Sequence, residues 1–200
     1  MSLCRTPSNC RFLVMIPQIE SLIAKGNTTF APYWGWHDDH READGTDAYL
    51  PALQQVRDEF YALTEILQRR VRCLQLGAGH CDAPHAVWRC LFEHVVTIDW
   101  RQSMVDSSIY PGMDTSSADA LALAREFGPY DLIFIDADHT FDGVARDYAR
   151  YAPLAAHQGI IAFHDALPRT AYPEVEVHRF IATLGATVIG DEVGVAWLRV

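Results

Sequence analysis

The chain has 200 residues, half of them hydrophobic and 21% charged, which is the composition of one folded domain with a substantial apolar core. Its formal charge is −10, with 16 basic against 26 acidic residues, and no basic stripe suited to nucleic acid is present. No apolar run has the length of a membrane span or a secretory signal, and the five cysteines lack zinc-like spacing. These features predict a cytoplasmic protein with a small-molecule partner, and neither nucleic acid nor membrane as a partner.

Residues 1–48 follow no regular pattern and are predicted to form an N-terminal segment ahead of a single domain over residues 49–200. The stretch 30–40 is aromatic and then polar, and Pro32 and Gly35 interrupt regular structure within it. Three uses of this segment stay open. Its aromatic side chains pack onto the domain, or it forms a flap over an active site, or it makes a contact in a homodimer.

From about residue 47 onward, the hydrophobic pattern predicts alternating helices and strands, which is typical of a parallel α/β sheet. The predicted helices cover 47–68, 83–92, 102–108, 119–127, 141–155 and 173–185. The predicted buried strands cover 71–76, 95–99, 131–135 and 159–163. Two further strands, 186–189 and 195–200, are joined by a short turn and are therefore predicted to be antiparallel.

A glycine-rich loop, Gly77-Ala78-Gly79, follows the first predicted strand. Glycine allows a tight turn and a close approach of the backbone to a ligand. Asp99 stands about twenty residues further on, at the end of the next strand, where an acid accepts the ribose hydroxyls of a nucleoside cofactor. Dinucleotide enzymes place a glycine where Asp82 stands, and an acid near a helix start would repel a pyrophosphate. Because such an acid suits an amino group, the pattern points to S-adenosylmethionine.

Polar residues follow two of the predicted strands at the point where each strand ends. They are Asp136, Asp138 and His139 after one strand, and His164 and Asp165 after the next strand along the chain. Ligands of open α/β sheets bind at the carboxyl ends of the strands, so these residues are candidates for chemistry. The simpler interpretation is that Asp138 caps the following helix and that the others have no joint function.

Five blocks of sequence, in this order, resemble the motifs of class I S-adenosylmethionine-dependent methyltransferases. They are most similar to the small cation-dependent O-methyltransferases and to the cephalosporin-hydroxylase-like group. The blocks are 75–81, 96–99, 118–120, 131–139 and 159–165, and the resemblance covers residues 71–200. It implies a Rossmann-like, doubly wound sheet of seven mostly parallel strands with an antiparallel last strand. Gln75 replaces an acid of the family and Cys81 its last glycine, which puts the strength of cofactor binding in question.

The resemblance also implies roles for individual residues. Those implied to bind the cofactor are Gly77, Ala78, Gly79, Asp82, Asp99, Trp100, Ala118, Asp119, Asp136 and Asp138. A divalent metal, magnesium, manganese or iron, is implied on Asp136, His164 and Asp165, with magnesium less favoured because it prefers oxygen to the His164 nitrogen. His139 stands where relatives have a lysine and is implied to remove the acceptor proton, with Asp136 as the second catalytic residue.

The expected function is therefore methyl transfer from S-adenosylmethionine to a small molecule, most often at a hydroxyl oxygen. Transfer without a metal, by alignment of the reactants alone, stays open. A catalytically inactive nucleoside-binding module of the same fold is the alternative function. A nicotinamide-dependent dehydrogenase is disfavoured by the missing third glycine and by the antiparallel last strands.

Overall fold

The structure is a computed structural model that describes residues 63, 66, 67, 69–78, 85, 88, 89, 91–102, 110–190 and 193–200. Six strands of this part form one sheet in the order β2-β1-β3-β4-β6-β5. Their bounds are β1 Arg72–Leu76, β2 His94–Ile98, β3 Tyr130–Ile135, β4 Ala155–Phe163, β5 Thr187–Ile189 and β6 Val195–Arg199. The strands β2, β1, β3 and β4 run parallel, whereas β6 is antiparallel to both β4 and β5.

The predicted α/β class, mostly parallel with an antiparallel last strand, is thus confirmed. The described residues contain six strands rather than the seven predicted. The N-terminal segment 1–48, the predicted helix 102–108 beyond its first residue, and the cofactor candidates Gly79 and Asp82 lie outside the described residues. No helix in the described part of the chain is long and apolar enough to cross a membrane.

Three helices follow the predicted pattern closely: α6 (Ala118–Phe127), α7 (Phe141–Tyr151) and α8 (Val177–Leu184). The hydroxyl groups of Ser117 and Thr140 cap the first two by accepting backbone N–H bonds. Pro153 cannot continue α7, so a 3-10 turn, η2 (Ala152–Leu154), leads into β4. The predicted helix 173–185 begins only at Val177, because residues 172–175 form a turn closed by a backbone hydrogen bond.

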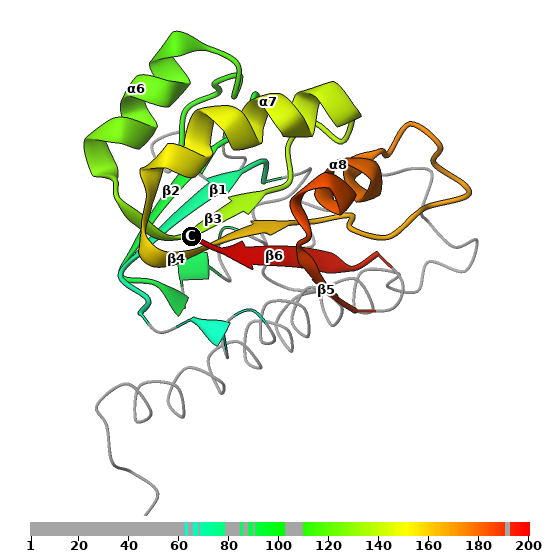
Figure 1. Cartoon of the computed structure of the whole chain (residues 1–200). Helices are drawn as coiled ribbons and strands as arrows, with labels where there is room; N and C mark the ends of the chain where they lie inside the picture. The colour runs from blue at the N-terminus through cyan, green and yellow to red at the C-terminus, as the bar shows by residue number, and fades with distance from the viewer. Residues whose placement is uncertain are drawn as a thin grey trace, which may run out of the picture.

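The sheet is buried on both faces, which explains its continuous apolar strands. Figure 1 shows α6, α7 and α8 on one face. Apolar side chains of these helices form a core cluster with β-strand residues such as Ile133, Ile135 and Phe163. On the opposite face, Phe134 packs against Trp88, with ring centroids 5.1 Å apart. Successive residues of β3 therefore face opposite layers, and the polar cluster at residues 136–139 begins directly after the strand has ended.

Candidate active site

A cavity of about 690 Å³ opens where β1, β2, β3 and β4 end. Residues that directly follow each of these four strands line it: Gly77, Asp99, Asp136 and His164. The other residues that line it are Trp100, Arg101, Asp114, Thr115, Ala137, Asp138, His139, Arg146 and Asp165. The cavity thus joins the predicted cofactor loop to both predicted polar clusters, at the edge of the sheet where ligands of this fold class bind.

The loop after β1 passes very close to the loop after β3. Gly77 has a φ of +84°, and a Cβ atom on it would overlap the backbone carbonyl oxygen of Asp136 and lie 2.9 Å from Cα of Ala137. The N–H of Asp136 in turn donates to the carbonyl of Leu76 at 2.8 Å. Position 77 therefore requires glycine both for its left-handed backbone and for its lack of a side chain.

Asp99 binds two separate stretches of backbone, the loop after β1 and the residues that follow Asp99 itself. Its buried carboxylate accepts hydrogen bonds from the N–H of Ala78 at 2.7 Å and from the N–H of Arg101 at 2.8 Å. Each oxygen keeps a free lone-pair direction, so the group can still accept from a ligand hydroxyl. Trp100 is 69% exposed at the cavity and carries the Arg101 guanidinium 4.3 Å from its ring centroid.

At the side of the cavity next to α6, the structure differs in detail from the sequence-based assignment. Ala118 and Asp119 are exposed in the first turn of α6 and do not line the cavity, whereas Asp114 and Thr115 do. Buried Thr115 donates its hydroxyl to Asp147 at 3.0 Å and accepts at its carbonyl from the Tyr151 hydroxyl at 2.7 Å. The sequence signal for these residues is a run of short polar side chains ahead of the predicted helix 119–127, to which no role is assigned from the sequence.

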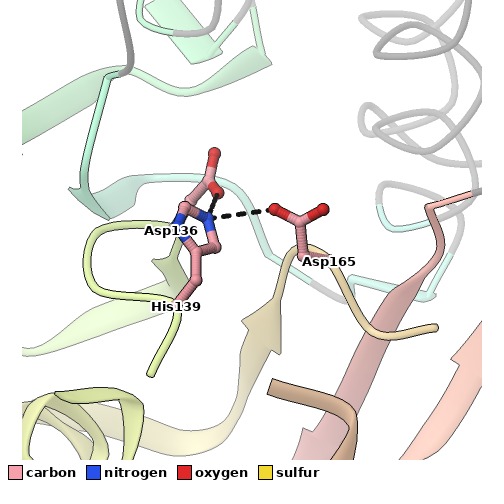
Figure 2. A group of neighbouring side chains, drawn as sticks. All are labelled: Asp136, His139 and Asp165. Atoms are coloured by element: carbon pink, nitrogen blue, oxygen red, sulfur yellow. Dashed lines mark hydrogen bonds and ion pairs between the residues drawn. The ribbon is translucent and has the colours of Figure 1, made fainter. Parts of the chain in front are cut away.

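The two polar clusters meet inside the cavity. Figure 2 shows the His139 ring between Asp136 and Asp165, with Nε2 3.1 Å from Oδ1 of Asp136 and 3.0 Å from Oδ2 of Asp165. The Nδ1 atom of His164 lies 3.2 Å and 3.5 Å from the same two oxygens. One potential metal-ligating atom from each of Asp136, His139 and Asp165 lies within 4.8 Å of the other two, close enough for the three to hold one metal ion.

Charge and burial act against each other in this cluster. Burial lowers the pKa of His139, but hydrogen bonds and the charges of Asp136 and Asp165 outweigh burial and raise it to about 10. Burial raises the pKa of Asp165, yet the two histidines reverse this effect and hold its pKa well below the ordinary value, and the same balance lowers the pKa of Asp136. Asp165 has a φ of +52° and also accepts from the Arg169 guanidinium at 2.8 Å. The charged forms of Asp136, Asp165 and His139 therefore stabilise one another in the metal-free protein.

Asp138 lines the same cavity but is bound to the start of α7. Its Oδ1 atom accepts from the N–H of Thr140 at 3.0 Å and from the Thr140 hydroxyl at 2.7 Å. Its Oδ2 atom lies 3.5 Å from Arg146, and a Cβ atom on Gly143 would overlap the carboxyl group. The capping residue itself is Thr140. The carboxylate of Asp138 thus stabilises the backbone that carries His139, which agrees in part with its interpretation as a helix-capping group.

Comparisons with known proteins agree with this fold. Residues 93–166 match a family described as a methyltransferase domain. No match was found among curated protein sequences.

Solved structures show a similar fold. A methyltransferase of Podospora anserina bound to S-adenosylhomocysteine has a TM-score of 0.53 at 15% identity, over 100% of this chain and 98% of that chain. The O-methyltransferase TomG of Streptomyces achromogenes, in complex with S-adenosylmethionine, has a TM-score of 0.52 at 16% identity, over 90% and 87%.

MycE methyltransferase of the mycinamycin pathway, in complex with magnesium, S-adenosylhomocysteine and mycinamycin VI, has a TM-score of 0.52 at 16% identity. The match covers 70% of this chain and 48% of MycE, so this chain spans about half the length of that relative. The predicted resemblance to S-adenosylmethionine-dependent methyltransferases is confirmed, and the chain has their fold.

Proposed function

We propose that this chain, which has the methyltransferase fold, transfers the methyl group of S-adenosylmethionine to an oxygen atom of a small molecule. One observation supports the proposal above all. A single cavity contains both the loop suited to a nucleoside cofactor and a cluster of carboxylates and imidazoles suited to an acceptor oxygen. TomG in complex with S-adenosylmethionine, and MycE in complex with magnesium, S-adenosylhomocysteine and mycinamycin VI, support the same assignment of cofactor and of a small-molecule acceptor.

We assign the cofactor to the part of the cavity next to β1 and β2. Asp99 would accept the ribose hydroxyls on its remaining lone pairs, and Gly77 lines the same part of the cavity. Trp100 offers an exposed ring for stacking on the adenine, and Asp114 and Thr115 supply polar atoms on the opposite side. Ala118 and Asp119 would then act by starting α6 rather than by touching the cofactor.

We assign a divalent cation to Asp136, His164 and Asp165, although the His139 nitrogen also lies close enough to both carboxylates to share one ion and is assigned below as the base. Neighbouring ligands of an octahedral ion with bonds of about 2.1 Å lie about 3.0 Å apart. The His164 nitrogen lies 3.2 Å and 3.5 Å from the two carboxylate oxygens, so small shifts bring all three atoms onto one ion. Because one donor is an imidazole, the set suits manganese or iron better than magnesium. A cation held there would neutralise the carboxylates and polarise the acceptor oxygen.

His139 is the group best placed to take the acceptor proton. Its Nε2 atom lies within 3.1 Å of both carboxylates, directly beside the proposed ion. A cation on Asp136 and Asp165 competes with the His139 proton for the same oxygens, so loading the site favours the neutral ring that a base requires. During transfer the acceptor O–H proton would pass to His139, the new O–C bond would form, and the C–S bond would break to leave S-adenosylhomocysteine.

Calorimetric titration tests the cofactor assignment. We expect S-adenosylmethionine and S-adenosylhomocysteine to bind and NAD not to bind, and Asp99→Ala to weaken the first two strongly. Failure of both sulfur compounds to bind the wild-type chain would overturn the proposed function.

Manganese titration, followed by electron paramagnetic resonance of the free ion, tests the metal assignment. We expect Asp136→Asn to abolish manganese binding while S-adenosylhomocysteine affinity stays nearly unchanged. The matched control is Asp142→Asn, which removes an exposed carboxylate in the first turn of α7 and should leave manganese binding intact. Equal loss of manganese binding in both variants, or in neither, contradicts the assignment.

A further inference from the structure

A chain of buried polar side chains lies directly beneath the glycine-rich loop. Gln75, Thr97 and His85 are 0%, 3% and 7% exposed, and none of them lines the cavity. The amide Nε2 of Gln75 donates to the carbonyl of Gly77 at 3.0 Å, and the Thr97 hydroxyl donates to Oε1 of Gln75 at 3.2 Å. The Nδ1 atom of His85 lies 2.7 Å from the same hydroxyl oxygen.

The hydrogen bonds that link His85, Thr97, Gln75 and Gly77 can run in one direction only. A backbone carbonyl accepts and never donates, so the nitrogen of the Gln75 amide must face Gly77 and its oxygen must face Thr97. The Thr97 proton is thereby directed to Gln75, and the proton between Thr97 and His85 must come from the His85 ring. A glutamate at position 75 would set a carboxylate against the Gly77 carbonyl, with no donor between the two oxygens.

Both ends of one peptide group are held by side chains as a result. Gln75 binds the C=O of Gly77, and Asp99 binds the N–H of Ala78 across the same peptide plane. The N–H of Gly77 is fixed as well, by the carbonyl of Ile98 at 2.8 Å. A rotation of this plane would break the bond to Gln75 and the bond to Asp99 together.

We infer that Gln75, with Thr97 and His85 behind it, is a positioning residue that orients the Gly77–Ala78 peptide and, through it, the Asp99 carboxylate. The amide takes the place of the acid of related methyltransferases and serves the loop rather than the cofactor. This inference rests on the proposed cofactor site. The register of the sheet places Gln75 directly beside Thr97 on the neighbouring strand, so the amide oxygen of Gln75 can accept the Thr97 hydroxyl.

Thr97→Val tests the inference, because it keeps the shape of the side chain and removes the hydroxyl. We expect hydrogen exchange at the Ala78 amide of the ligand-free protein to become about tenfold faster, and S-adenosylhomocysteine to bind about five- to tenfold more weakly. Thr97→Ser restores the hydroxyl and should restore both values. Cys73→Ala is the matched control. Cys73 is a core residue two positions before Gln75, on the same face of β1, so its truncation lowers stability without touching the hydrogen bonds of Gln75. This variant should keep the wild-type exchange rate at Ala78 and the wild-type affinity for S-adenosylhomocysteine.

The outcomes separate the two proposals. If wild-type protein binds S-adenosylhomocysteine but Thr97→Val leaves both the exchange rate and the affinity unchanged, the positioning role is wrong and the proposed function stands. If wild-type protein binds neither sulfur compound, the proposed function is wrong, and unchanged exchange at Ala78 in Thr97→Val then overturns the positioning role independently. If Cys73→Ala reproduces both effects, they follow from lower stability and the positioning role is again wrong.

Discussion

Gly77→Ala should damage stability and ligand binding together. A residue other than glycine at a φ of +84° costs about 1–2 kcal/mol. The added methyl group would also overlap the Asp136 carbonyl, and moving that backbone away strains the bond from the Asp136 N–H to the Leu76 carbonyl, worth about 1 kcal/mol. We therefore expect the free energy of unfolding to fall by about 2–3 kcal/mol. Because the displaced residue is the proposed metal ligand, manganese affinity should fall too.

Gly185→Ala separates strain from overlap. Gly185 ends α8 with a φ of +64°, yet nothing lies within 4 Å of the position that a Cβ atom would take. This variant should lose only about 1–2 kcal/mol and keep wild-type binding of S-adenosylhomocysteine and manganese. Urea unfolding and calorimetry on both variants give the comparison. Equal losses of stability, with unchanged ligand binding in Gly77→Ala, would refute the close-approach argument.

Three further changes have definite expected results. Asp131→Ala removes the common acceptor of the Val71 and Arg72 N–H groups and should lower the free energy of unfolding by about 2–3 kcal/mol. Calorimetry should show unchanged S-adenosylhomocysteine affinity, because Asp131 lies at the opposite end of β3 from the cavity. Tyr151→Phe should cost about 1 kcal/mol in urea unfolding, and a stability equal to wild type would mean that its buried bond contributes nothing. For His139, whose pKa rises from 6.5 unfolded to about 10 folded, the ion pairs stabilise the metal-free protein fully below pH 6.5 and lose their effect as pH rises through about 10. The free energy of unfolding, measured in chelator, should therefore fall more steeply between pH 6 and 10 for wild type than for His139→Gln. Parallel curves for the two proteins would contradict this assignment.

The strands of the sheet could be predicted because burial on both faces requires continuous runs of apolar residues, which are easy to find in a sequence. The run Tyr130–Ile135 is apolar apart from Asp131, and that carboxylate proved to be bound by backbone N–H groups rather than exposed. The cavity could be placed for the same reason, since polar residues that follow parallel strands must share one edge. Asp136 and Asp165, 29 positions apart in the sequence, meet there as expected.

Side-chain orientation could not be predicted in the same way. The place of His139 between two carboxylates depends on a turn held by Asp138 and Thr140, and on the left-handed backbone of Asp165, neither of which has a periodic signal. Gln75 appeared as a lost cofactor contact because a sequence does not tell toward which neighbour an amide turns. Residues Asp114 and Thr115 were missed because short polar residues before a helix are common as caps.

The place of β6 in the sheet has a consequence for how the chain folds. It follows β5 in the sequence, yet it lies between β4 and β5, so the edge of the apolar strand β4 stays unpaired until Val195–Arg199 joins the sheet. An exposed, hydrophobic strand edge invites pairing with other chains. The backbone just after Asp165 also waits for this step, because the N–H groups of Ala166 and Leu167 bind the carbonyls of Gly194 and Val193. Pairing of β6 therefore covers the edge of β4, and the residues just before β6 bind the backbone next to Asp165.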